Sequence, residues 1–451
     1  MDVLIRIAQL LLSLSILIIL HEMGHFLFAR LFKVRVEKFY LFFDAGFSLF
    51  KKKIGDTEYG IGWLPLGGYV KISGMIDESM DKEQMKKPPQ PYEFRSKPAW
   101  QRLLIMLGGV MVNFVLALFI YTMVLFAWGE SYVPADRLEY GLRFEETFHE
   151  MGLQDGDHIL ALDGENVEKY RTIHHDIVVN GTRVITVERE GEVMNIEVPA
   201  EMTAQLLKVE YAMEPIVPCE ISKLVEGSLM EAGGKEGDRI ISINGTPIDY
   251  YYQFVAATNR EKNTAFDLGV LRGSDTLALQ VTTNAEGMFG FQNVQHFEIF
   301  EPVVIKYTFL QSIPAGIKHG VGITKSYLKQ LKMLFKPKTK AYEELGGFIK
   351  IGSIFPPIWD WQSFWNMTAF LSIILAVMNI LPIPALDGGH VMFTLFEMVT
   401  GRKPGDKFLE YAQIVGMVLL LALLLYANLN DVIGLFNKYK DYLAIFVLQT
   451  F

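Results

Sequence analysis

Residues 3–32 read VLIRIAQLLLSLSILIILHEMGHFLFARLF, and this stretch decides the class of the fold. Arg6 is its only charge before His21, so the apolar run reaches the length of about 20 residues that a helix needs to cross a bilayer. No small-residue cleavage site follows the run, which argues against a removable signal peptide. The stretch therefore predicts a retained transmembrane helix.

The same stretch carries an H-E-x-x-H motif at His21, Glu22 and His25. Positions i and i+4 share one face of a helix, so both imidazoles can bind one Zn²⁺ while Glu22 takes a proton from water. The motif also occurs by chance on surface helices of soluble proteins. Inside an apolar span, however, ionisable groups are costly, and this favours a functional cluster.

A catalytic zinc site requires a third protein ligand. The candidate is Asp387, in the segment NILPIPALDGGH at 379–390, which again lies in an apolar run. Pro382 and Pro384 must break the helix there, and broken backbone at membrane depth is tolerated only where it lines a cavity or is buried in protein. Counted along the two spans from their outer ends, His21 and Asp387 both fall toward the cytoplasmic side. One site can therefore hold all three ligands.

The two motifs together resemble the site-2 protease family of intramembrane zinc metalloproteases. Members of that family combine an H-E-x-x-H in the first span with N-x-x-P-x-P-x-L-D-G in a later one. The region between the motifs is similar to the bacterial regulator of sigma-E protease type. The resemblance implies one Zn²⁺ per chain on His21, His25 and Asp387, with Glu22 catalytic and Asn379 holding the substrate backbone or the developing oxyanion.

Composition agrees with a membrane protein that carries soluble modules. Of 451 residues, 51% are hydrophobic and 21% are charged, too apolar for an ordinary soluble protein but too charged to consist of spans alone. The net charge of −9 argues against nucleic acid as a partner. The single cysteine, Cys219, excludes an internal disulfide and receives no role.

The sequence predicts a polytopic α-helical membrane protein with about four spans, a membrane-associated β-hairpin and two tandem extracytoplasmic PDZ domains, which are α+β and mainly β. The expected parts are a first span at 1–33, a cytoplasmic loop with the hairpin at 34–99, a second span at 100–128, PDZ domains at 132–213 and 214–284, a post-PDZ segment with an amphipathic helix at 285–360, a third span at 364–400, a fourth span at 408–434 and a C-terminal tail at 435–451.

The loop after the first span is rich in Lys and Arg, and the positive-inside rule makes it cytoplasmic. Both termini and the PDZ domains are then extracytoplasmic. Within the loop, Gly67, Gly68 and Tyr69 resemble the family's membrane-associated β-hairpin, which offers an edge to an extended substrate. A hairpin that only packs the site is an equally open reading. The charged, Pro-rich segment 78–98 predicts a mobile connector.

An internal repeat supports the two PDZ domains. Residues 156–164 read GDHILALDG and residues 237–245 read GDRIISING, and the shared strand and tight Asp-Gly or Asn-Gly turn resemble the core of a PDZ domain. A PDZ domain ordinarily captures an extended C-terminal strand, but neither copy has a Gly-Leu-Gly-Phe loop, so a peptide ligand stays open. The family offers another role, in which the pair excludes substrates with bulky outer domains.

The resemblance predicts hydrolysis of peptide bonds within transmembrane segments of single-pass proteins already trimmed outside, such as anti-sigma factors or signal-peptide remnants. Pro382, Pro384 and the hairpin are candidates for holding the unwound substrate. The expected location is the bacterial inner membrane. A PDZ scaffold and a zinc transporter are the two alternative classes. An intact Glu22 argues against the scaffold, and the lack of several polar spans argues against the transporter.

Overall fold

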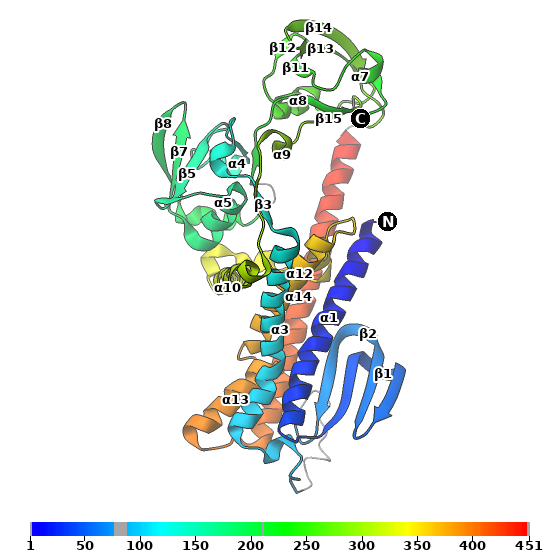
Figure 1. Ribbon diagram of the computed structural model, residues 1–451, viewed down its shortest axis with the longest axis vertical. Coiled ribbons are helices and arrows are strands. Elements are labelled where there is room, and N and C mark those ends of the chain that lie inside the picture. The colour runs from blue at the N-terminus through cyan, green and yellow to red at the C-terminus, as the bar shows by residue number, and fades with distance from the viewer. Residues whose placement is uncertain (1, 76–87, 210–211, 449–451) are drawn as a thin grey trace. The chain divides into compact units, whose positions relative to one another are not determined.

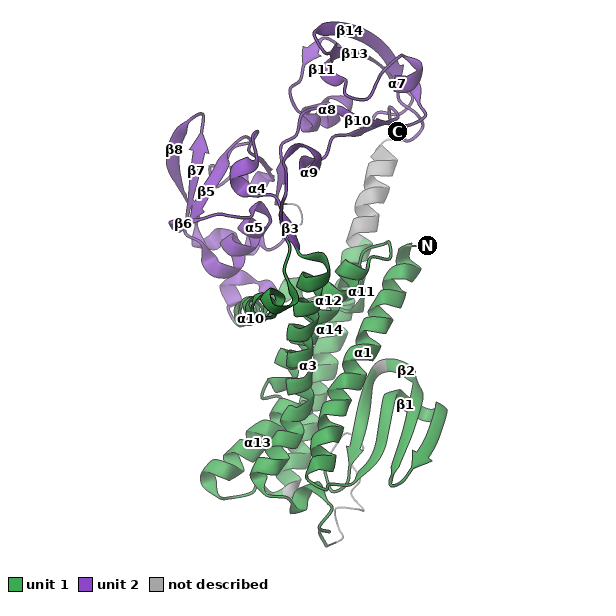
Figure 2. Ribbon diagram, in the orientation of Figure 1, with its two compact units in different colours: residues 1–129, 306–335, 342–451 green, residues 130–305, 336–341 purple. Residues whose placement is uncertain are grey.

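The computed structural model describes residues 2–75, 88–209 and 212–448, which form two compact units. Unit 1 comprises residues 1–129, 306–335 and 342–451, and unit 2 comprises 130–305 and 336–341 (Figure 2). The described part of unit 1 contains four helices long and apolar enough to cross a membrane. The prediction of a polytopic membrane protein with β elements is confirmed at this level. Residues 78–87 of the predicted connector lie outside the described residues.

The four candidate spans are α1 (Asp2–Leu31), α3 (Ala99–Trp128), α12 (Trp361–Ile380) and α14 (Asp406–Leu448). They run alongside one another in Figure 1. The predicted third span at 364–400 is two helices, because α12 ends at Ile380 and α13 (Asp387–Thr400) begins after a break. The prolines in that break account for it. Helix α14 continues to Leu448, beyond the span end expected at 434.

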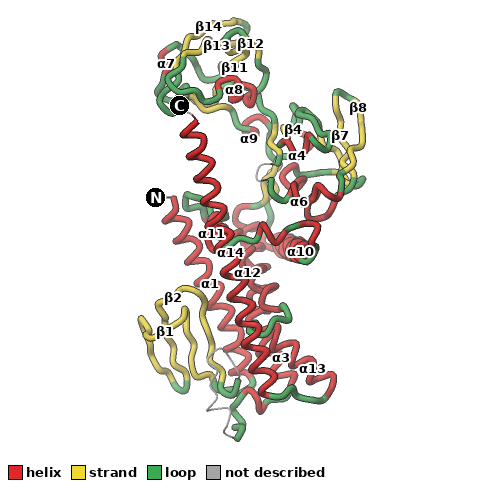
Figure 3. The backbone as a smooth tube through the Cα atoms, turned by 180° about the vertical axis from the view of Figure 1, so that it is seen from behind, coloured by secondary structure: helices red, strands yellow, loops and turns green. Residues whose placement is uncertain are grey.

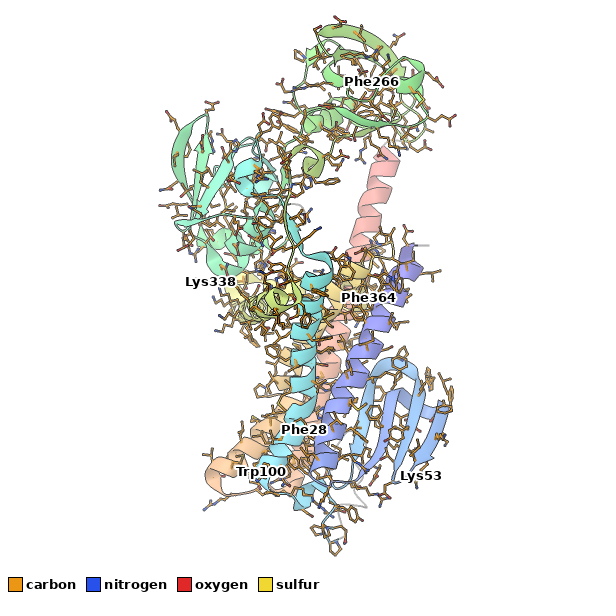
Figure 4. The ribbon with its side chains drawn as sticks, in the orientation of Figure 1. Phe28, Lys53, Trp100, Phe266, Lys338 and Phe364 are labelled. Atoms are coloured by element: carbon orange, nitrogen blue, oxygen red, sulfur yellow. The ribbon has the colours of Figure 1, made fainter. Side chains whose placement is uncertain are left out.

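Helices α1 and α3 approach closely because each has a glycine at the crossing. A Cβ on Gly24 would lie 2.3 Å from the carbonyl oxygen of Gly108, and a Cβ on Gly108 would lie 2.6 Å from that of Gly24. Small residues at such a crossing let two backbones touch. Phe28 and Trp100 mark one end of this helix pair in Figure 4, and Phe364 of α12 lies toward the opposite end. This contact fixes α3 beside the H-E-x-x-H turn of α1.

Polar side chains also connect the spans. Ser13 of α1 accepts a hydrogen bond from Thr368 of α12 at 3.0 Å, and Ser372 donates to the carbonyl of Asn113 at 2.7 Å. All four residues are fully buried. Hydrogen bonds of this kind hold transmembrane helices together where apolar burial gives no net driving force.

The predicted hairpin is formed by β1 (Val36–Ile54) and β2 (Thr57–Ile72). The two strands bend, so residues 38–41 of β1 pair with both 58–61 and 68–71 of β2, while residues 48–54 pair with 57–62. The hairpin packs against α1 and is the yellow sheet beside the red helices in Figure 3. Residues 67–72 are thereby brought next to the H-E-x-x-H motif.

Unit 2 contains two four-stranded sheets with equivalent orders, β6-β5-β7-β8 and β12-β11-β13-β14. The first sheet uses β5 (His158–Leu162), β6 (Glu165–Asn166), β7 (Val184–Arg189) and β8 (Glu192–Glu197). The second uses β11 (Arg239–Ile243), β12 (Thr246–Pro247), β13 (Ala265–Arg272) and β14 (Asp275–Thr282). The repeated sequence therefore forms the same sheet twice.

The two sheets share the same tight turn. Asp163 and Asn244 have positive φ values of 52° and 48° and are each followed by a glycine that also has positive φ, as a two-residue hairpin turn requires. Both sheets also contain a matching ion pair. In each, a buried aspartate just before β5 or β11 pairs with the last residue, an arginine, of the neighbouring strand β7 or β13. These pairs are Asp157 with Arg189 and Asp238 with Arg272, each at 2.7 Å.

The two repeats differ in their helices. The second has α8 (Tyr251–Thr258), whereas the first has only α5 (Ile173–His175) followed by a π-helical stretch, Asp176–Gly181. Strand β15 (Phe291–Asn293) pairs with β10 (Ile221–Leu224), so the structure of the second repeat extends past the boundary expected at 284. The remaining short elements of unit 2 are β3 (Glu130–Tyr132), β4 (Leu142–Phe144), α4 (Glu146–His149), α6 (Thr203–Leu206), β9 (Met213–Pro215), α7 (Ser228–Glu231), α9 (His296–Ile299) and β16 (Val303–Ile305).

The predicted amphipathic helix is α10 (Phe309–Leu334) of unit 1. Its buried Gly316 and Gly320 pack on Thr122 and Leu118 of α3, with a Cβ at Gly316 lying 2.4 Å from the Thr122 hydroxyl. One face of α10 is therefore occupied by α3. The short helix α11 (Phe348–Ser353) follows. In the first turn of α11, the backbone N–H groups of Ile349 and Lys350 donate hydrogen bonds to Asp431 of α14.

Candidate metal centre

Helix α1 presents two imidazoles to one point. His21 and His25 lie one turn apart, both are buried, and their Nε2 atoms are 3.2 Å from each other. Gly24 allows this turn to lie directly against α3. The helix spacing predicted from the sequence is therefore realised as a pair of convergent nitrogen ligands.

Asp387, which is far from α1 in the sequence, lies next to the same two nitrogen atoms. It is the first residue of α13, directly after the proline-containing break that follows α12. Its Oδ2 lies 3.2 Å from Nε2 of His21 and 3.3 Å from Nε2 of His25. The three atoms thus form a nearly equilateral triangle.

The size of this triangle fits a zinc ion. A tetrahedral Zn²⁺ with ligand bonds of about 2.0–2.1 Å holds its ligand atoms about 3.3 Å apart, which matches the three separations. The Oδ2 of Asp387 is also buried without a hydrogen-bond partner among the described residues. A buried carboxylate oxygen in that state needs a cation, so these residues are suited to hold zinc and leave a fourth position open.

Both imidazoles are oriented through their second nitrogen. Nδ1 of His25 lies 2.8 Å from the carbonyl oxygen of Ile105, which can only accept, so Nδ1 carries the proton and Nε2 is free for metal. Nδ1 of His21 lies 3.3 Å from the side-chain amide of Asn113. The amide oxygen and nitrogen occupy interchangeable positions, and with its oxygen toward His21 the amide accepts the Nδ1 proton. Such partners fix the tautomer of metal-binding histidines.

Gly109 of α3 provides the space for the imidazole pair. A Cβ there would lie 2.5 Å from Nε2 of His25 and 2.6 Å from Cε1 of His21. Gly109 was not among the site residues predicted from the sequence. Its proximity to the ligands could not be read from the sequence, because it depends on the rotation of α3 about its own axis.

Glu22 lies between the metal ligands and the hairpin. The backbone of Val70 is within hydrogen-bonding reach of its carboxylate, and a Cβ on Gly68 would lie 3.6 Å from its Cγ. The catalytic candidate of α1 therefore lies beside strand β2. A Cβ at position 68 would clash with Ile18 at 2.6 Å and with the carbonyl oxygen of Tyr40 at 2.7 Å.

These residues line a cavity of about 770 Å³. Its walls include His21, Glu22, His25 and Asp387 as well as four of the predicted substrate-binding residues, namely Gly67, Gly68, Tyr69 and Asn379. Pro382 and Pro384, the other two, are outside its wall. Their role in the structure is to break the chain between α12 and α13, where Asp387 begins the next helix.

Asn379 lies in the last turn of α12, and its Nδ2 is 3.3 Å from Nε2 of His21. An amide donor next to the ligand cluster can hydrogen-bond a carbonyl that approaches the metal position. The structure therefore places Asn379 beside the candidate zinc ligands, and its role toward the substrate stays a prediction.

The cavity wall also contains a polar cluster that sequence reasoning missed. The hydroxyl of Tyr69 donates to Asp44 at 2.9 Å and accepts from Lys38 at 3.4 Å, and all three side chains line the cavity. Burial and the hydrogen bond to Asp44 raise the pKa of Tyr69, so the hydroxyl stays protonated. Residues 38, 44 and 69 meet only through the register of β1 and β2, and no local sequence signal reports that register.

Comparison with known proteins gives a consistent result. A family model described as peptidase family M50 matches residues 9–423. A protein of Treponema pallidum (strain Nichols) named "Putative zinc metalloprotease" is 26% identical over 448 residues, which cover 94% of this chain and 98% of that relative. The "Regulator of sigma E protease" of Haemophilus influenzae is 26% identical over 466 residues, covering 96% of this chain and all of the relative, 100%. The similarity thus extends over both motifs and the region between them.

Proposed function

Because the chain belongs to peptidase family M50, the site-2 protease family, and is a zinc metalloprotease, we propose that it hydrolyses peptide bonds within the transmembrane segments of single-pass membrane proteins. The proposal rests mainly on one observation: Nε2 of His21, Nε2 of His25 and Oδ2 of Asp387 lie within 3.3 Å of one another. All three residues belong to the unit that contains the four candidate spans. Ligands placed on membrane helices bring the chemistry to substrates that are themselves in the bilayer.

We assign the catalytic roles to residues that line the cavity. His21, His25 and Asp387 would hold the zinc, which when bound acts as a Lewis acid that polarises the scissile carbonyl and makes water acidic. Glu22 lies in the same cavity wall; it accepts the proton of the attacking water and later delivers a proton to the leaving amine. Asn379 donates to the oxygen of the scissile carbonyl as negative charge develops on it.

The substrate must be extended before it can be cut, because a helix hides its peptide bonds in its own hydrogen bonds. Residues 68–72 of β2 pair with β1, and residues 67–72 line the cavity. We therefore assign to Gly67, Gly68 and Tyr69 the binding of an unwound strand by main-chain hydrogen bonds. The broken segment containing Pro382 and Pro384 leads directly into Ala385 and Leu386, which line the same cavity.

We assign the two repeats of unit 2 to tandem PDZ domains that act as a substrate filter. Support comes from the repeated sheets, from their matching ion pairs and from the relative named regulator of sigma E protease. In this proposal the protein lies in a bacterial inner membrane with the repeats outside. It takes substrates of the anti-sigma-factor or signal-peptide-remnant type after their outer domains have been trimmed.

The test is cleavage of a single-pass substrate with a short outer segment by the purified full-length chain in detergent. Glu22→Gln should reduce the cleavage rate at least about 100-fold, since it removes the general base, while one zinc per chain is retained. Glu165→Gln, on the exposed short strand β6 of unit 2, should cleave like the wild type. Adding a zinc chelator to the wild type should also abolish cleavage.

Either of two results would contradict the proposal. One is cleavage by Glu22→Gln at the wild-type rate. The other is a wild-type chain that binds zinc but cleaves only soluble peptides and leaves every membrane-embedded substrate intact.

A further inference from the structure

Ala385, two residues before the candidate ligand Asp387, has a strained backbone. Its φ angle is +81°, in the left-handed region that non-glycine residues rarely adopt. Among the described non-glycine residues from Trp361 to Leu448, only Ala385 has a positive φ. A strained residue next to a ligand persists only when its surroundings hold it in place.

Helix α14 supplies the contact that holds it. The backbone N–H of Ala385 donates to Oε1 of Gln413 at 3.1 Å. Gln413 is 5% exposed and directly precedes the apolar stretch IVGMVLLLALLL at 414–425. Three residues further along the same helix, Gly416 lies against the preceding peptide. A Cβ on Gly416 would lie 1.7 Å from the carbonyl oxygen of Pro384 and 2.3 Å from its carbonyl carbon.

The rest of α14 does not explain these two residues. Only 11% of its most apolar stretch is buried, compared with 39% in α3 and 44% in α12. A helix with so few buried positions gains little from general packing, and a buried glutamine in it is costly unless its amide has a specific partner. Gln413 also lines the catalytic cavity together with Ala385 and Asp387. The contact with the ligand segment is thus a specialised part of α14.

We infer that Gln413 and Gly416 of α14 are positioning residues that hold Ala385 in its left-handed conformation and thereby place the Asp387 carboxylate on the metal. Gln413 restrains the peptide through one hydrogen bond, and Gly416 admits the Pro384 carbonyl without a gap or a clash. If the restraint is removed, Ala385 relaxes to negative φ and the start of α13 rotates away from His21 and His25. The inference rests on the proposed role of Asp387 as the third ligand.

The first experiment measures zinc affinity of the purified full-length chain by competition with a chromogenic chelator, a readout that does not require activity. Gln413→Leu keeps the side-chain size and removes the acceptor. It should weaken zinc binding by about 10- to 100-fold, the range for partners that orient a metal ligand. The matched control is Gln9→Leu, since Gln9 is also a fully buried glutamine in a span, donating to the carbonyl of Pro356. This control should stay within about twofold of the wild type, because it touches no ligand.

A second variant separates positioning from a general loss of packing. Glycine adopts positive φ without strain, so in an Ala385→Gly background the segment needs less restraint. Adding Gln413→Leu to Ala385→Gly should weaken zinc binding by no more than about threefold, a clear departure from additivity. A purely structural glutamine would cost the same in both backgrounds, and that result would overturn the inference.

The glycine contact has its own matched pair on the same helix. Gly416→Ala forces the Pro384 carbonyl to move and should weaken zinc binding at least as much as Gln413→Leu, whereas Gly434→Ala meets nothing within 4 Å and should have no effect. If Gly416→Ala and Gly434→Ala bind zinc with equal affinity, the proposed role of Gly416 is wrong.

Asp387→Asn distinguishes failure of this inference from failure of the proposed function. If Asp387→Asn loses zinc while Gln413→Leu binds it like the wild type, the positioning role is wrong and the ligand assignment stands. If Asp387→Asn itself retains wild-type zinc affinity, the ligand assignment on which the inference rests is wrong.

Discussion

At the residue scale, the candidate metal centre depends on a glycine that leaves room for the imidazoles as well as on the ligands themselves. The imidazoles of His21 and His25 occupy the volume that a methyl group at Gly109 would fill. Glycine gives a helix no intrinsic stability. Its use beside the ligands is explained by the space that the metal site requires.

Gly109→Ala should therefore disrupt zinc binding without touching a ligand. The added Cβ would lie 2.5 Å from Nε2 of His25, so the imidazole must leave its metal-binding orientation, and zinc affinity should fall by at least about 100-fold. Zinc content of the purified chain, measured by elemental analysis, checks this. Gly322→Ala on α10, where a Cβ meets nothing within 4 Å, should keep its zinc. Full zinc content in Gly109→Ala would show that the histidines bind from another rotamer.

At the element scale, each repeat of unit 2 is tied together by one buried carboxylate. Asp238 is 1% exposed and precedes β11, and it accepts two hydrogen bonds from Arg272 at the end of β13. The hydrogen bonds from Arg272 hold the pKa of Asp238 below its usual range, with a further contribution from the N–H of Lys235. Asp157 and Arg189 repeat the arrangement in the first sheet.

The lowered pKa fixes the sign of the pH dependence. Because the folded pKa lies below the unfolded value of about 3.9, the stabilisation by Asp238 is complete above that value and is lost as the pH falls through the folded pKa. Asp238→Asn should lower the stability of the second repeat by about 1–3 kcal/mol at neutral pH, and the difference from the wild type should shrink below about pH 4. Hydrogen exchange of β11 and β13 in the full chain measures this.

Asp275→Asn is the control for that measurement, since Asp275 is exposed at the β13–β14 turn of the same sheet. Asp275→Asn should leave the hydrogen exchange of β11 and β13 unchanged both at neutral pH and below about pH 4. A difference for Asp238→Asn that grows toward acid pH would mean that the ion pair does not stabilise the sheet.

At the scale of the whole molecule, residues 130–305 of unit 2 are an insertion between α3 and α10. Its first and last strands, β3 and β16, pair with each other, with Glu130 opposite Ile305. Paired residues of antiparallel strands lie only about 5 Å apart, so the chain leaves and returns at neighbouring points. Residues 131–304 are thus removable with a short linker and little strain on the helices that flank them.

The proposed filter role then predicts a change of selectivity. A chain in which a short Gly-Ser linker replaces residues 131–304 should cleave single-pass substrates with and without a bulky outer domain at similar rates, whereas the full chain should cleave only the trimmed form. Paired cleavage assays in detergent check this, and Glu22→Gln in the shortened chain controls for other proteases. If the full chain cleaves both substrates equally, unit 2 is not a filter.

The sequence by itself determined the parts of this protein that depend on short-range order. The i,i+4 spacing of His21 and His25, the apolar length of the spans, the break at Pro382 and Pro384 and the repeated Asp-Gly and Asn-Gly turns are all local patterns. Local patterns fix helix faces, breaks and turns because backbone geometry repeats over a few residues. The membrane class, the enzyme class and the metal followed from them.

Only the tertiary structure decided which distant residues share the site. The rotation of α3 brings Gly109 and Asn113 to the histidines, the register of the hairpin joins Lys38, Asp44 and Tyr69, and α14 sets Gln413 against the strained Ala385. These contacts depend on how whole helices and strands pack across separations of 25 residues, from Asp44 to Tyr69, to 92 residues, from His21 to Asn113. Packing at that range is set by the sum of many side-chain contacts, which no local sequence pattern records.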